Sequence, residues 1–151
     1  MEQKEKVFIN APADRIWQFI ENPANLQSWN PKVKEVSVLG NASFYLGYVF
    51  GIQYEMNNRV SEFRGEIVDY RQPDRLTFHF SGGNLPPGSF VEEEFTLDRK
   101  DTVTLLQRVV RYNVSGIPLW AKTLVWLLFH LGKPTGEPYL NRLKAIVEGS
   151  H

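Results

Sequence analysis

Hydrophobic and polar residues alternate along the middle of the chain, as they do in β-strands. The clearest example runs from residue 44 to residue 56, where every second residue is large and apolar. This apolar row consists of Phe44, Leu46, Tyr48, Phe50, Ile52, Tyr54 and Met56. Because successive side chains of a strand point to opposite faces, the row predicts a strand with one buried face.

Shorter stretches with the same period of two predict the other strands, and clusters of Gly, Pro, Asn, Asp and Ser separate them. In the stretch from Leu76 to Ser81, for example, Leu76, Phe78 and Phe80 alternate with smaller or polar residues. The predicted strands cover residues 4–10, 33–39, 44–56, 59–70, 76–81, 90–97 and 103–112. We therefore expect an antiparallel sheet of six to seven strands.

Two short helices are predicted directly after the first strand. Pro12 suits the first position of a helix, and the residues behind it repeat with helical spacing. The first helix would bury Ile16, Trp17, Phe19 and Ile20. Asn22 and Pro23 begin the second, which would bury Leu26 and Trp29 and end before Pro31.

The last quarter of the chain, residues 117–147, predicts a long helix that is interrupted near Pro134. Its second half carries Leu140, Leu143, Ile146 and Val147 at helical spacing. Strands flanked by helices indicate an α+β fold, with a curved sheet around the C-terminal helix. We expect one domain over residues 1–148, and residues 149–151 resemble a tag remnant.

Charge and composition narrow the function. The 17 basic and 17 acidic residues balance, which argues against a nucleic-acid binder and gives no electrostatic attraction to a membrane. No apolar stretch is long enough for stable membrane insertion, and no signal sequence is evident, so we expect a cytoplasmic protein. The chain has no cysteine and only three scattered histidines, so we predict neither a metal site nor a cofactor.

Four segments, taken in their order along the chain, resemble one known superfamily. The segments are residues 7–17 (VFINAPADRIW), 29–33 (WNPKV), the turn at 97–104 and 139–144 (YLNRLK). They resemble the START-like, polyketide cyclase/dehydrase superfamily, which has the helix-grip fold. This resemblance implies a seven-stranded sheet that grips the C-terminal helix around a hydrophobic cavity. It also implies binding of lipids, sterols, polyketides or plant-hormone-like ligands, whereas catalysis is confined to a minority of members.

The aromatic residues of the predicted sheet are candidates for the wall of such a cavity. The candidate lining residues are Tyr48, Phe50, Tyr54, Phe78, Trp120 and Leu124. A buried tyrosine needs a hydrogen-bond partner, which a ligand or water can supply. The alternative is that these residues form an ordinary sheet core.

Two further polar residues, Glu93 and Gln107, could orient the polar end of a ligand together with Tyr48 and Tyr54. If Phe95 and Leu97 face inward, Glu93 must do so too, and a buried carboxylate needs a partner or a function. The alternatives are a bulge that turns it outward, or an ion pair with Arg64 or Arg108. Gln107 lies between Leu105 and Val109 on the last strand and could also point inward, or could lie at a frayed strand end.

We therefore expect a protein that binds a small hydrophobic molecule between sheet and C-terminal helix. One alternative is a cyclase or dehydratase that uses Glu93 as its acid. A second is an interaction module that forms a homodimer through the apolar helix at residues 120–129, without a ligand.

Overall fold

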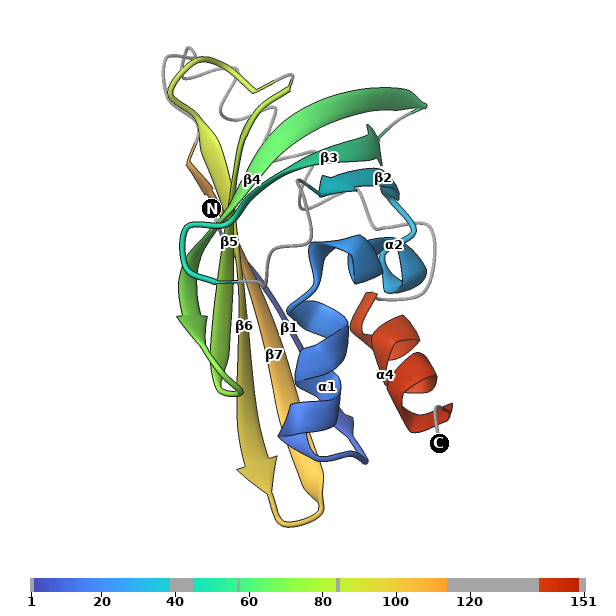
Figure 1. Ribbon diagram of the computed structural model, residues 1–151. Coiled ribbons are helices and arrows are strands. Elements are labelled where there is room, and N and C mark those ends of the chain that lie inside the picture. Colours follow the sequence, from blue (N-terminus) through green and yellow to red (C-terminus); the bar gives the residue numbers. More distant parts are fainter. Residues whose placement is uncertain (1, 39–44, 57, 84, 114–138, 150–151) are drawn as a thin grey trace.

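The computed structural model describes residues 2–38, 45–56, 58–83, 85–113 and 139–149, and these form a sheet with helices on one side (Figure 1). The strands are β1 (Glu2–Ile9), β2 (Val33–Val38), β3 (Val49–Met56), β4 (Arg59–Arg71), β5 (Arg75–Gly82), β6 (Phe90–Lys100) and β7 (Val103–Asn113). The helices are α1 (Ala13–Ile20), the 3-10 helix η1 (Pro23–Asn25), α2 (Leu26–Trp29) and α4 (Tyr139–Gly149).

The described strands form one antiparallel sheet in the order β1-β7-β6-β5-β4-β3-β2. Apart from β1, each strand lies beside its neighbour in sequence, and β1 closes the sheet against β7. The sheet curves around the side on which α1, α2 and α4 lie (Figure 1). This arrangement confirms the predicted α+β, helix-grip fold with seven strands and two short helices after the first strand.

Most predicted elements are present, with small shifts at their ends. Pro12 precedes α1 as its N-cap residue instead of occupying its first turn. The larger correction concerns the long apolar row, because β3 begins only at Val49. Gly47 has a φ of +91° in the turn before β3, and this turn leaves Leu46 exposed instead of on the buried face. The predicted helix before residue 139 lies outside the described residues.

The packed part of the core lies between the helices and the sheet. The inward faces of α1 and α2 supply Ile16, Trp17, Leu26 and Trp29, all fully or almost fully buried. Trp29 meets the edge of Phe95 at 5.8 Å between ring centroids. Helix α4 adds three further buried side chains, Leu140, Leu143 and Val147.

One glycine makes room for an aromatic ring in this core. Gly65 of β4 pairs with Phe50 on one side and with Phe80 on the other. A Cβ atom at Gly65 would collide with the Phe50 ring. The ring therefore lies across the backbone of β4, and a larger residue at position 65 would displace it.

Helix α4 is fixed to the first strand by polar contacts at its C-terminal half. Lys144 donates from Nζ to the carbonyl of Phe8 at 2.8 Å and also pairs with Glu148. Glu148 in turn accepts the backbone N–H of Asn10 at 2.8 Å. These hydrogen bonds, from Lys144 first and Asn10 second, lower the pKa of Glu148 below its ordinary value of 4.5.

The aromatic core predicts a large difference between two phenylalanines. Phe95 is fully buried, whereas Phe8 is 57% exposed on the opposite face of the sheet. We expect Phe95→Ala to lower the free energy of unfolding by about 3–5 kcal/mol, because it leaves a cavity among packed rings. Phe8→Ala should change it by less than about 0.5 kcal/mol. Urea denaturation measures both, and equal losses would contradict this description of the core.

The contacts of Glu148 predict a pH dependence of stability. Its pKa is lowered in the folded state, so the ionised carboxylate stabilises the fold at neutral pH. This contribution is lost as the pH falls through the folded-state pKa. We expect the difference in unfolding free energy between wild type and Glu148→Gln to be largest near neutral pH and to shrink below pH 4.5. Glu35→Gln, at an exposed position of β2, is the control, and a difference that stays constant with pH would contradict the prediction.

Candidate functional site

A buried ion pair lies on the concave face of the sheet. The alternation of β6 that buries Phe95 and Leu97 also turns Glu93 inward, where it is only 4% exposed. Arg108 of β7 is 8% exposed and donates from Nη2 to Glu93 Oε2 at 2.8 Å. Of the alternatives left open by the sequence, the inward position and the ion pair with Arg108 are both present.

A second acid approaches Arg108 from the edge of the sheet. Glu5 of β1 lies opposite Arg108 in the β1–β7 register, and its Oε2 lies 3.5 Å from Arg108 Nη1. The other oxygen of Glu5 accepts the backbone N–H of Leu140 at 3.2 Å. Glu5 therefore connects the ion pair to the first turn of α4, where a carboxylate also interacts favourably with the helix dipole.

The ring of Tyr139, the first residue of α4, lies beside two cations. The guanidinium of Arg108 is 5.0 Å from the ring centroid, and the Lys32 ammonium is 5.9 Å from it. Both distances are within the range of cation–π attraction. The first turn of α4 is thus held beside the ion pair by two contacts, that of Glu5 with the Leu140 N–H and that of the Tyr139 ring with Arg108.

Tyr54 brings a phenol to the same place from β3. Its oxygen accepts a hydrogen bond from Asn30 Nδ2 at 2.6 Å, and Asn30 Oδ1 accepts the backbone N–H of Lys32 at 3.1 Å. Burial, together with the negative charge of Glu93, raises the pKa of Tyr54, although Arg108 acts in the opposite direction. The phenol therefore keeps its proton at neutral pH and can donate it in a hydrogen bond.

The electrostatics of Arg108 and Tyr112 follow from the same burial. Burial alone would lower the pKa of Arg108, but Glu93, Tyr54 and Glu5 outweigh it, so that the pKa is raised. Burial raises the pKa of Tyr112 despite the nearby Arg108. Among the described residues, Arg108 Nε is buried and has no hydrogen-bond partner. The guanidinium thus remains charged and has a donor to spare.

Two half-buried apolar side chains, Val91 and Phe63, lie near this polar cluster. Val91 lies opposite both Phe80 and Tyr112 in the strand pairing, and Phe63 meets the edge of the Tyr54 ring at 6.3 Å. An open depression of about 280 Å³ is bordered by Gln3, Lys4, Glu5 and Arg108. The border of this depression is polar, and it reaches the cluster at Glu5 and Arg108. The apolar neighbours Val91 and Phe63 lie outside its lining.

The predicted site residues separate into three groups. Tyr54 and Glu93 lie together in the polar cluster. Phe50 and Phe78 lie in the packed aromatic core, with 5.8 Å between their ring centroids. Tyr48 stacks on Phe50 and lies six residues before Tyr54 in the sequence. Trp120 and Leu124 lie outside the described residues.

Gln107 requires a correction. In the register of the β6–β7 hairpin, Phe95 lies opposite Arg108 and Glu93 lies opposite Val110. Because Glu93, Phe95 and Arg108 face inward, Gln107 points to the outer face of the sheet. It therefore does not belong to the site.

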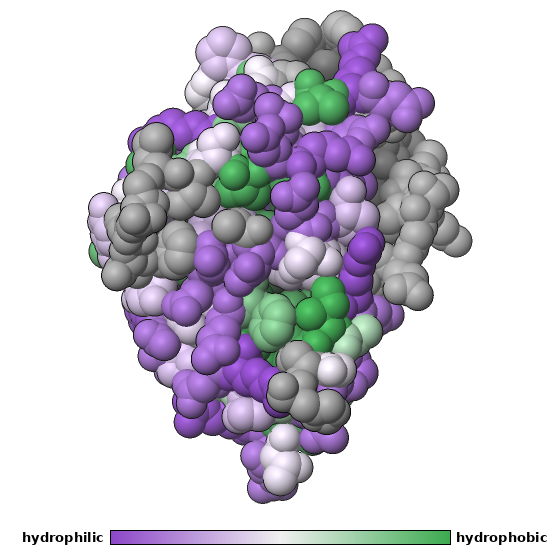
Figure 2. All heavy atoms as spheres, turned by 45° about the vertical axis from the view of Figure 1, so that its right-hand side comes forward, coloured by the Kyte–Doolittle hydropathy of each residue, from purple (hydrophilic) through white to green (hydrophobic). Residues whose placement is uncertain are grey.

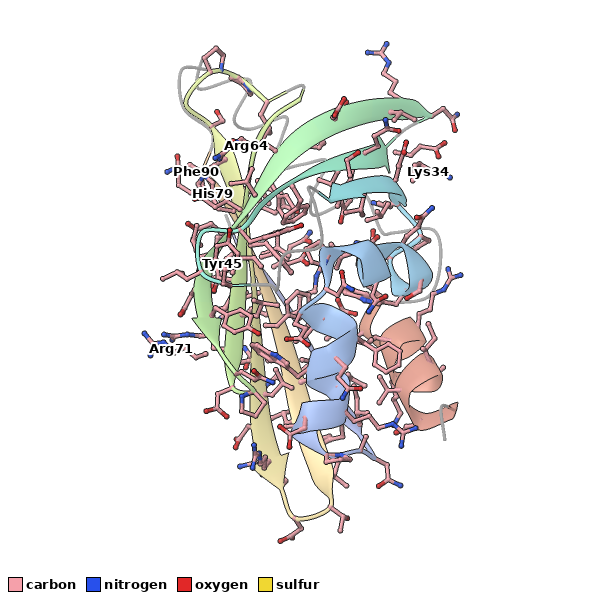
Figure 3. The ribbon with its side chains drawn as sticks, in the orientation of Figure 1. Lys34, Tyr45, Arg64, Arg71, His79 and Phe90 are labelled. Carbon is pink, nitrogen blue, oxygen red and sulfur yellow. The ribbon has the colours of Figure 1, made fainter. Side chains whose placement is uncertain are left out.

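The outer face carries a different set of residues. Figure 3 shows His79, Phe90 and Arg64 on the side of the sheet away from the helices. His79 Nδ1 lies 3.5 Å from Glu92 Oε1, and its ring is 4.7 Å from that of Phe90. His79 thus lies on the face opposite Phe78 and Phe80, in keeping with the alternation along residues 76–81.

Four residues of the cluster were not predicted as site residues: Glu5, Asn30, Arg108 and Tyr139. Arg108 was named only as one partner for Glu93. The signal that could have found it is the pairing rule, since an inward carboxylate needs a cation on the neighbouring strand. Asn30 and Tyr139 occur in the segments that carry the family resemblance, but nothing in their spacing places them beside Glu93.

Two kinds of feature are absent from the part of the chain that the structure describes. Within the ranges given above, no three His, Asp or Glu side chains gather in a way that could hold a metal ion. Over the same ranges, no helix has both the length and the hydropathy needed to cross a membrane.

Comparison with known proteins identifies the family. The profile described as "Polyketide cyclase / dehydrase and lipid transport" matches residues 2–147. The chain belongs to this family. Members of the polyketide cyclase/dehydrase family generally bind hydrophobic ligands. No curated protein matches by sequence.

Solved structures share this fold along nearly their whole length. A Thermus thermophilus protein matches with a TM-score of 0.76 and 16% identity, covering 99% of this chain and 98% of its own. A START superfamily protein from Mycobacterium smegmatis gives 0.67 and 17%, covering 98% and 97%. The Panax ginseng major latex-like protein 151 gives 0.68 and 15%, covering 97% and 96%. At these identities the similarity establishes the fold alone.

The buried pair predicts strong energetic coupling between Glu93 and Arg108. Removing one partner leaves an uncompensated charge and should cost about 3–5 kcal/mol of unfolding free energy. The double variant Glu93→Leu/Arg108→Met should lose much less than the sum of the two single variants. Thermal and urea unfolding of all four proteins measure the coupling.

The neighbouring pair Glu94–Arg111 is the matched control. It joins the same two strands at 3.3 Å, but on the outer face, where the Arg111 side chain is well exposed. The equivalent cycle, Glu94→Leu and Arg111→Met, should give a coupling of only about 0–1 kcal/mol. Equal coupling in the two cycles would contradict the difference in burial described above.

Proposed function

We propose that this protein binds a small, mostly apolar molecule on the concave face of the sheet, with the polar end of the molecule against the Glu93–Arg108 pair. The observation that carries the proposal is the pair itself, buried beside Tyr54 and near half-buried apolar side chains. The site is therefore suited to a molecule with one polar group and an apolar body.

Stability alone gives a poor reason for placing these charges inside. Taking two ions out of water costs several kcal/mol each, and well-packed apolar residues in their place are often equally stable. Perturbed ionisable groups in a concave site are instead a recognised feature of functional sites. The family context supports the same conclusion, since members generally bind hydrophobic ligands.

The two parts of the site would contribute differently to binding. Burial of the apolar body would provide most of the affinity, at about 25 cal/mol per Å² before the costs of ordering. The polar cluster would contribute orientation, because buried donors and acceptors must be matched. The ligand is thus selected by size and apolar surface first and by its polar group second.

The cyclase or dehydratase hypothesis required an inward carboxylate that is free to move a proton. Glu93 does face inward, but Arg108 engages its carboxylate at 2.8 Å. The binding proposal therefore uses Glu93 as a fixed hydrogen-bond acceptor. The homodimer hypothesis concerns residues 120–129, outside the described part, and stays a prediction.

Binding predicts a different outcome for two tyrosines. Nile red, a neutral lipophilic dye, should gain fluorescence when it binds, and a competing ligand should displace it. Tyr54→Phe should weaken the binding of a competitor with a polar headgroup roughly two- to tenfold, because the variant loses one hydrogen bond. Tyr70→Phe is the matched control, since it removes a hydrogen bond to Glu21 at 2.9 Å outside the site. Failure of the wild-type protein to bind the dye or to release it to any lipophilic competitor would contradict the proposed function.

A further inference from the structure

We infer that the polar end of the ligand is an uncharged acceptor oxygen, a carbonyl or a hydroxyl, and that the site discriminates against carboxylates. This inference rests on the proposed function and specifies the class of ligand. It follows from the charge balance of the cluster and from the hydrogen-bond donors that remain in it.

The charges around the site balance in the part of the chain that the structure describes. Glu93 and Glu5 contact the two terminal nitrogens of Arg108, at 2.8 Å and 3.5 Å. The second cation, Lys32, lies over the Tyr139 ring at 5.9 Å from its centroid. Tyr54 remains protonated because its pKa is raised. Lys4, which borders the open depression, pairs with Glu2 at 3.4 Å. The acids and cations of the site thus cancel, and no net charge attracts an ion.

A carboxylate headgroup would find Arg108 already paired with Glu93 and Glu5. To reach Arg108 it would have to approach both Glu93 and Glu5, and like charges brought together in a buried site cost several kcal/mol. A cationic headgroup would likewise meet Arg108 and Lys32. Either ion would also lose its hydration on entering the site. A neutral group avoids all three costs.

The donors that remain match a neutral oxygen. Arg108 Nε has no partner among the described residues, and Tyr54 accepts from Asn30, which leaves its own O–H to donate. A carbonyl oxygen has two lone pairs and can accept from both. A hydroxyl can accept in the same way, and it can also donate a hydrogen bond to the carboxylate of Glu93. That carboxylate has lone pairs beyond the one that accepts from Arg108.

The experiment compares ligands that share an apolar body and carry either a neutral headgroup or a carboxylate. Decyl alcohol is paired with decanoate, and acetylnaphthalene with naphthoate, so that both a chain and a ring system are sampled. Displacement of Nile red from the purified full chain at neutral pH gives the affinity of each. For the wild-type protein we expect the neutral member of each pair to bind at least about tenfold more tightly, or 1.4 kcal/mol.

Glu93→Gln tests the origin of this preference. Without this carboxylate, only Glu5 still contacts Arg108, at 3.5 Å, and the cluster gains a net positive charge. The variant should therefore favour the carboxylate member of each pair, a reversal of at least about tenfold. Glu94→Gln is the matched control, because Glu94 is the next residue on β6 and pairs with Arg111 on the outer face. It should leave the preference unchanged.

A second variant keeps the test decisive if Glu93→Gln does not fold, which circular dichroism would show. Glu5→Gln removes the other carboxylate but retains an oxygen for the Leu140 N–H. It should shift the preference toward carboxylates by a smaller factor. Tighter binding of carboxylates by the wild type, or an unchanged preference in both variants, would overturn the inference while leaving the proposed function intact. If no ligand of either kind binds, the proposed function itself is wrong.

Discussion

The ion pair between Glu93 and Arg108 is imposed by the alternation of side chains along β6 and by the pairing of β6 with β7. The alternation of β6 buries Phe95 and Leu97, and this places Glu93 on the same face. A carboxylate that is 4% exposed needs a cation, and the antiparallel register puts Arg108 on the adjacent strand at the diagonal position. The position of one side chain thus determines the chemistry of the concave face.

Among the described residues, the helices pack on the aromatic part of this face, and the polar cluster lies beside Tyr139, the first residue of α4. Trp17, Trp29 and the buried residues of α4 cover the aromatic core around Phe78 and Phe95. Beyond them, Tyr54, Glu93 and Arg108 replace the apolar contacts. From the side of the helices, hydrophilic residues cover most of the described surface, and hydrophobic ones show only in small separate areas (Figure 2).

The sequence predicted the elements better than it predicted which face a residue occupies. The buried face of β5 could be assigned from the sequence, because Leu76, Phe78 and Phe80 alternate with smaller or polar residues. Strand β7 could not, because Leu105, Leu106, Val109 and Val110 place apolar residues on both faces. Its orientation depends on the turn: β6 extends to Lys100, and Lys100 pairs with Val103, whereas the predicted strands ended at residue 97 and resumed at residue 103. That uncertainty put Gln107 in the predicted site and left Arg108 out of it.

The contacts of α4 connect the ion pair to the rest of the fold. At its first turn, Leu140 donates to Glu5, and Glu5 also contacts Arg108, so that one acid serves the helix and the pair together. At its other end, Lys144 and Glu148 bind the backbone of Phe8 and Asn10, outside the cluster. The two attachments are therefore chemically independent. A molecule bound at the pair would touch the residues that hold the first turn of α4, while the attachment to the end of β1 would remain. The same geometry explains why a buried charge can be tolerated here, since one guanidinium contacts the carboxylates of Glu93 and Glu5 and the ring of Tyr139.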